Sequence, residues 1–310
     1  MELRIMTEPQ QGATYEDQLA MARHAEQLGF SAFARSDHLS RIGGGDRGPG
    51  ATDAWVTLGA LARETATIRL VSMLSCATFR APGLLAVQAA QVDSMSGGRL
   101  EVGLGAGWFE PEHEQFGIPF PPLSERFERL EEQLAILTGF WSTPVNRPFS
   151  FSGRHYSLTD CPALPKPAQA PHPPIIIGGK GKRLTPRLAA KYADEFNIAF
   201  DTLDNEAAQF RRVQAACREM GRDPASMVMS VAVTTAIGIT DREADARLAR
   251  LGEDRGRLQL GPGLVGTVER ARERIAEYSD MGVSRLYLQI KDVHDDEQLE
   301  VIAAELLGRV

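Results

Sequence analysis

Strand-like and helix-like segments alternate eight times along this chain of 310 residues, and this alternation limits the possible folds more than any other feature. Short apolar runs bounded by turn residues are typical of buried parallel strands, and the segments between them repeat apolar residues at helical spacing. Eight βα units predict an α/β fold, a (β/α)8 TIM barrel in a single domain over residues 1–310, with a doubly wound sheet as the alternative. The predicted strands are Leu3–Met6, Ala32–Arg35, Ile68–Leu74, Leu100–Gly103, Ile175–Gly178, Phe196–Phe200, Val228–Ala236 and Leu286–Ile290.

The helical pattern is clearest after the fourth predicted strand, and the regular spacing is lost directly after it. Phe127, Leu130, Leu134, Leu137 and Trp141 share one helical face. Residues 142–172 contain six prolines and no helical period. We interpret them as an insertion after the fourth helix, over about residues 142–173, with a short hairpin at 149–156 and a proline-rich extended passage. A second loop, rich in glycine, is predicted at 42–52.

Composition and charge exclude several classes of partner. The formal net charge is -7, so we expect neither nucleic acid nor an anionic membrane as a partner. No apolar run reaches the length of a membrane span, and Met1–Ile5 lacks the apolar core of a signal peptide. The cysteines Cys76, Cys161 and Cys217 form no CxxC pair. These features predict a cytoplasmic protein.

Polar residues gather where the predicted strands end. In a TIM barrel the active site is built on the loops at the carboxyl ends of the strands. We therefore place the candidate site at this end of the barrel, and predict it to include the residues after seven of the strands, namely Thr7-Glu8, Ser36–His38, Ser75-Cys76, Gly105–Glu112, Gly179–Arg183, Asp201 and Lys291.

Two glycine-rich turns follow apolar strands and indicate a bound phosphate. Gly103–Trp108 lacks the GxGxxG spacing of a dinucleotide fingerprint, and Gly178–Arg183 lacks the spacing of a P-loop. The second turn still combines flexible glycines, the cations Lys182 and Arg183, and the amino terminus of a predicted helix. Backbone N–H groups in such a turn attract anions. A phosphorylated cofactor is the ligand that this turn predicts.

His38 is the candidate catalytic residue. Consecutive strand residues point to opposite faces, so Ser36, Asp37 and His38 are not expected to form a hydrolase triad. A histidine at a strand end of a barrel is suited to general acid–base chemistry, and Asp37 is expected to contact either a ligand or loop backbone. Arg80 is predicted to pin its loop to a carboxylate. A metal-dependent hydrolase, using Glu110, Glu112 and His113, is a weaker alternative because only His38 lies at a strand end.

Taken together, these segments resemble the luciferase-like monooxygenase superfamily, and within it the oxidoreductases that use the deazaflavin coenzyme F420. The resemblance extends over nearly the whole chain and depends on the order of several short motifs. These motifs are Leu28–Ser31, Ser36–His38, Ser75–Arg80, Ser96–Glu110, Gly117–Phe127, Pro173–Gly179, Tyr192–Asn197 and Gly282–Gln289.

The resemblance implies a barrel that holds a flavin-like ring at its carboxyl end. A bulge after the third strand, with a non-prolyl cis peptide at Met73–Leu74, would support the ring. The turn after the fifth strand would hold the cofactor phosphate, and His38 would transfer a proton. The cofactor-binding residues so implied are Asp37, Met73, Leu74, Ser75, Ala106, Gly107, Trp108, Gly178, Gly179, Lys182 and Arg183.

The function predicted at this point is hydride transfer between F420 and a small-molecule organic substrate. Trp108 stands where the related sugar-phosphate dehydrogenases carry a glutamate, which favours a more apolar substrate than a sugar phosphate. A two-component monooxygenase using reduced FMN, and a non-catalytic flavin-binding relative, are the alternatives on the same fold. Because members of this superfamily often form dimers, the resemblance also implies a possible homodimer.

Overall fold

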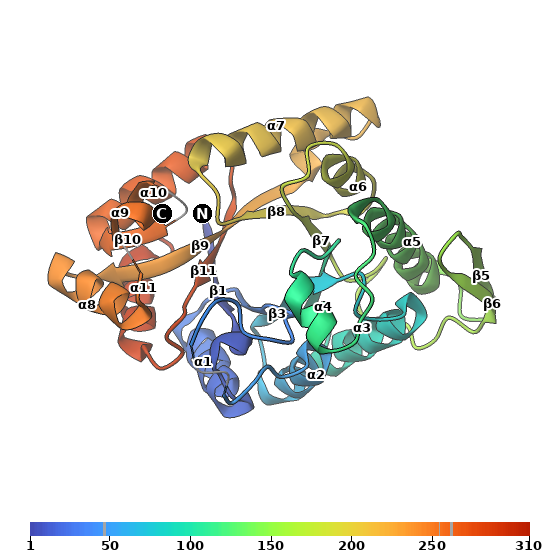
Figure 1. The fold of residues 1–310 in the computed structure, drawn as a ribbon, viewed down its shortest axis with the longest axis horizontal. Helices are drawn as coiled ribbons and strands as arrows, with labels where there is room; N and C mark the ends of the chain where they lie inside the picture. The colour runs from blue at the N-terminus through green and yellow to red at the C-terminus, as the bar shows by residue number, and fades with distance from the viewer. Residues whose placement is uncertain (46–47, 254, 261–262) are drawn as a thin grey trace.

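The computed structural model describes residues 1–45, 48–253, 255–260 and 263–310, and in these residues eight parallel strands close into a barrel (Figure 1). β11 pairs with β9 on one side and with β1 on the other, and β9 also pairs with β8, which completes the ring. The predicted (β/α)8 barrel is therefore confirmed. In barrel order the strands are β1 (Glu2–Thr7), β2 (Ala32–Arg35), β3 (Arg69–Cys76), β4 (Leu100–Gly105), β7 (Ile175–Gly178), β8 (Glu195–Ala199), β9 (Val228–Gly238) and β11 (Arg285–Gln289).

Helices surround the barrel because each connection between parallel strands must cross back over the outside of the sheet. The face predicted for α5 is confirmed: Leu130, Leu134, Leu137 and Trp141 are buried, and Phe127 packs at its edge. The helices are α1 (Tyr15–Leu28), α2 (Ala54–Glu64), α3 (Pro82–Ser96), α4 (Glu110–Gln115), α5 (Leu123–Ser142), α6 (Leu184–Tyr192), α7 (Leu203–Glu219), α8 (Asp241–Leu251), α9 (Arg255–Leu260), α10 (Val268–Asp280) and α11 (Asp296–Leu306), with 3-10 turns at Pro9–Gln11 and Pro224–Ser226.

The insertion after α5 contains the predicted hairpin. β5 (Phe149–Ser152) and β6 (Ser157–Cys161) pair antiparallel, so the hairpin continues five residues beyond the predicted end. It lies outside α5, at the edge of the molecule (Figure 1). The Glu132 carboxylate on α5 accepts the backbone N–H groups of residues 154–156 at 2.7–3.0 Å, and these bonds anchor the tip of the hairpin. Residues 46 and 47 of the predicted loop at 42–52 lie outside the described residues.

One element differs from the expected plan. A further strand, β10 (Gly263–Thr267), pairs in parallel with the last residues of β9, from Thr234 to Gly238. Its sequence, with glycine at two of five positions, has a weak strand signal, because glycine has no side chain to pack on a sheet. The connection between β9 and β11 is therefore α8–α9–β10–α10 and not a single helix.

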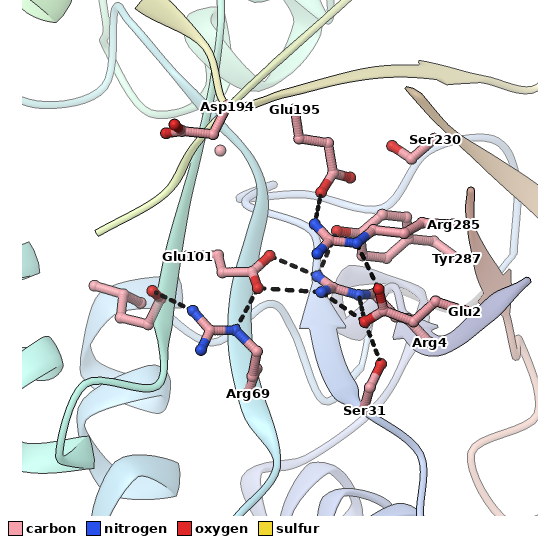
Figure 2. Close-up of polar contacts among 12 residues, drawn as sticks. Glu2, Arg4, Ser31, Arg69, Glu101, Asp194, Glu195, Ser230, Arg285 and Tyr287 are labelled. Atoms are coloured by element: carbon pink, nitrogen blue, oxygen red, sulfur yellow. Dashed lines mark hydrogen bonds and ion pairs between the residues drawn. The ribbon is translucent and has the colours of Figure 1, made fainter. Parts of the chain in front are cut away.

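The amino-terminal end of the barrel is filled by ion pairs (Figure 2). Arg4 is fully buried and donates to the Glu101 carboxylate at 2.5 Å and to the Tyr287 hydroxyl at 2.9 Å. Arg285 pairs with Glu195 at 2.5 Å. Burial alone would raise the pKa of Glu101, but the charge and hydrogen bonds of Arg4 lower it. This end lies opposite the strand ends where barrel active sites form, so we assign the cluster to stability.

Within the part of the chain that the structure describes, no helix combines the length and the apolar composition needed to cross a membrane.

Candidate active site

The residues predicted for the site lie together at the carboxyl end of the barrel. Glu8 follows β1, His38 follows β2, Ser75 lies at the end of β3, Trp108 follows β4 and Gly178 ends β7. Because all five strands are parallel members of one sheet, their carboxyl ends open onto the same end of the barrel. The glycine-rich turn at 178–183 and the candidate catalytic histidine therefore share one end.

His38 is held by a carboxylate from another loop. Its Nδ1 lies 2.9 Å from Oε1 of Glu112, and the other carboxylate oxygen accepts the Leu39 N–H at 2.8 Å. Glu112 is on α4 and is only 2% exposed. A carboxylate facing Nδ1 places the proton of a neutral imidazole on that nitrogen, which leaves Nε2 as the atom able to accept a proton.

Asp37 belongs to a network that fixes the loop after β3. Its carboxylate accepts the Ser75 hydroxyl at 2.7 Å and pairs with Arg80, which also reaches Asp53 at 2.6 Å. The prediction that Arg80 pins its loop to a carboxylate is confirmed. Asp37 is buried, and its contacts are with protein groups, so its predicted contact with a cofactor stays a prediction.

The predicted absence of a triad agrees with the contacts in the structure. The Ser36 hydroxyl donates to Gln10 at 2.6 Å, Asp37 faces Ser75, and His38 faces Glu112. The three consecutive residues that follow β2 therefore have three separate partners and do not contact one another through their side chains.

The bulge expected at the end of β3 is present. The Met73–Leu74 peptide bond is cis, as the resemblance implied, and the pairing with β4 shifts between Ser72 and Ser75. Two glycines make room for the Leu74 side chain. A Cβ added to Gly103 would lie 2.5 Å from Leu74 Cδ2, and one added to Gly178 would lie 2.6 Å from Leu74 Cδ1. Leu74 is partly exposed, so its side chain provides an apolar surface at the carboxyl ends of the strands.

The loop after β4 packs closely against β3 at Gly107 and exposes the side chain of Trp108. Gly107 has φ +81°, and a Cβ there would lie 2.2 Å from the Cys76 sulfur, so only glycine fits. Arg126 from α5 donates to the Gly107 carbonyl at 2.8 Å. The Trp108 side chain is 65% exposed, and its ring meets the His38 ring edge-on at 5.8 Å between centroids. An exposed aromatic residue beside the candidate catalytic histidine provides an apolar surface for a ligand.

The turn after β7 has the features of a phosphate site. The side chains of Lys182 and Arg183 are exposed and make no hydrogen bond or ion pair with any other described residue. Thr185, in the first turn of α6, is 2% exposed, and its hydroxyl likewise has no hydrogen-bond partner among the residues described. A Cβ on Gly181 would lie 2.6 Å from that hydroxyl, so the glycine turn passes directly over it. Unpaired donors and cations at a helix amino terminus fit an anionic group.

Glu8 extends a polar network across the β1 side of the site. Gln289 donates to Glu8 and accepts the Thr234 hydroxyl at 2.7 Å. Burial raises the pKa of Glu8, and the nearby His38 and Lys291 oppose that rise. The sequence placed Glu8 and Lys291 at the strand ends but did not predict this network.

The side chains considered as metal ligands form hydrogen bonds with other protein groups. Glu112 faces His38, whereas His113 lies 2.6 Å from Thr78 Oγ1 through Nε2 and 2.9 Å from the Phe109 carbonyl through Nδ1. In the described ranges, no group of three or more histidine, cysteine, aspartate or glutamate side chains is arranged to hold a metal ion.

The sequence does not indicate that Glu112 is the partner of His38. Glu112 was predicted only as the end of the site loop Gly105–Glu112 and as a possible metal ligand, and 74 positions separate it from His38. Its neighbours Glu110 and Glu114 are equally acidic, and only the packing of α4 over the strand ends distinguishes Glu112 from them.

Comparison with known proteins agrees with the geometry. Over 258 residues the chain is 30% identical to the pyrimidine monooxygenase RutA of Enterobacter cloacae subsp. cloacae, covering 79% of this chain and 66% of the relative. It is 32% identical to an FMNH(2)-dependent dimethylsulfone monooxygenase of Pseudomonas putida over 166 residues, which cover 54% of this chain and 43% of the relative. The matches therefore span less than two thirds of these relatives' own lengths.

The fold is shared with solved enzymes. A structure of an F420-dependent secondary alcohol dehydrogenase in complex with an F420-acetone adduct superposes with a TM-score of 0.84 at 18% identity, covering 99% of this chain and 98% of the other. The family model described as luciferase-like monooxygenase matches residues 1–260. The chain therefore belongs to the luciferase-like monooxygenase family.

Proposed function

We propose that this protein is a monooxygenase that binds reduced FMN at the carboxyl end of its barrel and transfers oxygen to an apolar organic substrate. The observation that carries the proposal is the position of the unpaired side chains of Lys182, Arg183 and Thr185 at the same end of the barrel as His38. The names of the two curated relatives, both monooxygenases and one FMNH(2)-dependent, favour this chemistry over hydride transfer.

The residues present fit a flavin phosphate and ring. Lys182, Arg183 and the buried Thr185 hydroxyl would hold the phosphate. Leu74 would support the ring, and the loop 106–108 would flank it. When bound, reduced FMN supplies the two electrons with which molecular oxygen is divided between the substrate and water.

The chain itself supplies proton transfer and an apolar binding surface. Glu112 holds Nδ1 of His38, so Nε2 is the atom that would take or give a proton. Trp108 and Phe109, whose rings both meet His38 edge-on, would pack against the substrate and exclude water from this side.

F420-dependent hydride transfer is the second candidate. It is favoured by the order of the motifs, from Ser36–His38 to Pro173–Gly179, that resemble the F420-dependent oxidoreductases. F420 also carries a phosphate that the turn at 178–183 would hold. Trp108, in place of the glutamate of the sugar-phosphate dehydrogenases, weighs against a phosphosugar substrate.

Cofactor titration separates these candidates. We expect FMN to bind the purified chain more tightly than F420, as measured by fluorescence titration and by mass measurement of the extracted cofactor. Tighter binding of F420 would select the second candidate, and binding of neither cofactor would refute both.

His38→Ala tests the catalytic assignment. With an apolar ketone and a dialkyl sulfide as probe substrates, the rate of substrate oxygenation by the reduced FMN complex is expected to fall roughly 10²–10⁴-fold, the usual contribution of a general acid or base. Cofactor affinity should change little. His24→Ala, on α1 at the opposite end of the barrel, is the matched control. Equal turnover in the His38 variant and the wild type would remove His38 from the mechanism and favour a flavin-binding role alone.

A further inference from the structure

Gln209 on α7 holds the turn that follows β7. The side chain is 1% exposed, and its Nε2 donates to the Gly179 carbonyl at 3.2 Å and to the Gly181 carbonyl at 2.8 Å. Its Oε1 accepts from Arg212 at 2.9 Å. Carbonyl oxygens only accept hydrogen bonds and a guanidinium only donates them, so this arrangement permits a single orientation of the amide.

This contact also determines where the backbone donors of the turn point. The Gly179–Lys180 and Gly181–Lys182 peptide bonds are trans, and in a trans peptide the N–H points opposite to the C=O. Gln209 draws both carbonyls toward α7, so the N–H groups of Lys180 and Lys182 face away from α7. Neither N–H donates to an acceptor within the described ranges.

Apart from this contact, the backbone of the turn is held at its start, where the Gly179 N–H donates to the Asn197 carbonyl at 3.3 Å. Three of the four residues 178–181 are glycine, the residue with the widest choice of backbone conformations, and Gly179 has φ +134°. Lys180 contributes only side-chain contacts, with the Phe200 carbonyl at 2.9 Å and with the Asp201 carboxylate. A peptide unit that rotated would present a carbonyl oxygen to an anion in place of an N–H.

We propose that Gln209 is a positioning residue for the cofactor phosphate, which it serves by orienting the backbone N–H groups of Lys180 and Lys182 without touching the phosphate itself. This inference rests on the proposed function, because it requires that the turn bind a phosphorylated cofactor. It predicts that Gln209 affects affinity for the phosphate alone and leaves affinity for the ring unchanged.

The test compares FMN with riboflavin, which has the same ring and ribityl chain but lacks the phosphate. Both are titrated into the full chain as wild type and as Gln209→Met, which keeps the buried volume but removes the donors. Gln214→Ala, on the same helix and partly exposed, is the control. We expect FMN affinity to fall roughly tenfold in Gln209→Met, the size that loss of one or two hydrogen bonds allows. Riboflavin affinity, and both affinities in the control, should stay within twofold.

Each of the other outcomes would refute a different premise, either the role of Gln209 or the phosphate site. Equal losses for FMN and riboflavin, or no loss for either, would overturn the role of Gln209 while leaving the phosphate site intact. A wild type that binds FMN no better than riboflavin would refute the phosphate site itself, and the inference with it. Should Gln209→Met fail to fold by circular dichroism, Gln209→Glu, of nearly the same size, is measured instead. It is expected to lose more FMN affinity than tenfold, because its charge repels both the carbonyls and the phosphate.

Discussion

Glu206 should make the stability of this protein fall as the pH rises. The side chain lies on α7, is fully buried and faces the Tyr278 hydroxyl on α10. Burial raises its pKa from the ordinary value of 4.5 to about 8, and the charge of Asp201 adds to the rise. The folded protein therefore keeps a proton on Glu206 at neutral pH, whereas the unfolded chain releases it.

The size of the effect follows from linkage. Between pH 4.5 and 8 the folded state binds one more proton than the unfolded state at this group. The free energy of unfolding therefore falls by about 1.4 kcal/mol per pH unit, and by about 5 kcal/mol over the whole interval. This stability is fully present below pH 4.5 and is lost as the pH rises through about 8.

The assay is urea unfolding of the wild type and of Glu206→Gln at pH 6 and pH 8. Glutamine has nearly the same shape but does not titrate. The wild type should lose about 2 kcal/mol more than the variant between these two pH values. Glu219→Gln, an exposed position on the same helix, should follow the wild type. Parallel curves for the wild type and Glu206→Gln would show that Glu206 ionises normally and would refute the reasoning.

Two further predictions concern buried carboxylates. Glu101→Ala leaves the fully buried Arg4 without its main partner and should lower the free energy of unfolding by about 3–5 kcal/mol, measured in urea; a loss below about 1 kcal/mol would contradict the assigned stabilising role. Glu112→Gln keeps the size of the side chain but cannot accept from both His38 and Leu39, so the turnover number should fall at least tenfold while KM changes less than threefold. An unchanged turnover number would show that Glu112 does not orient His38.

The strands could be predicted closely because their signals are local. Ala32–Arg35 and Ile175–Gly178 were predicted with the boundaries that the structure shows, since each is a short buried run between turn residues. The cis bond at Met73–Leu74 was predicted only through resemblance to a family, because nothing in a leucine or methionine side chain favours it. β10 was missed because two glycines weaken its pattern.

The sequence by itself determined the βα alternation, the barrel and the residues at the strand ends, where the candidate site lies. It did so because the hydrophobic period and the turn residues are set by a few neighbouring positions. Only the tertiary structure decided which partners those residues have. Glu112 bonds to His38 across 74 positions of the chain, and Gln209 on α7 bonds to Gly181 in the turn before α6. Such contacts depend on the closure of the barrel and on how the helices pack around it. A hydrogen bond between two distant segments does not change the residue pattern of either segment.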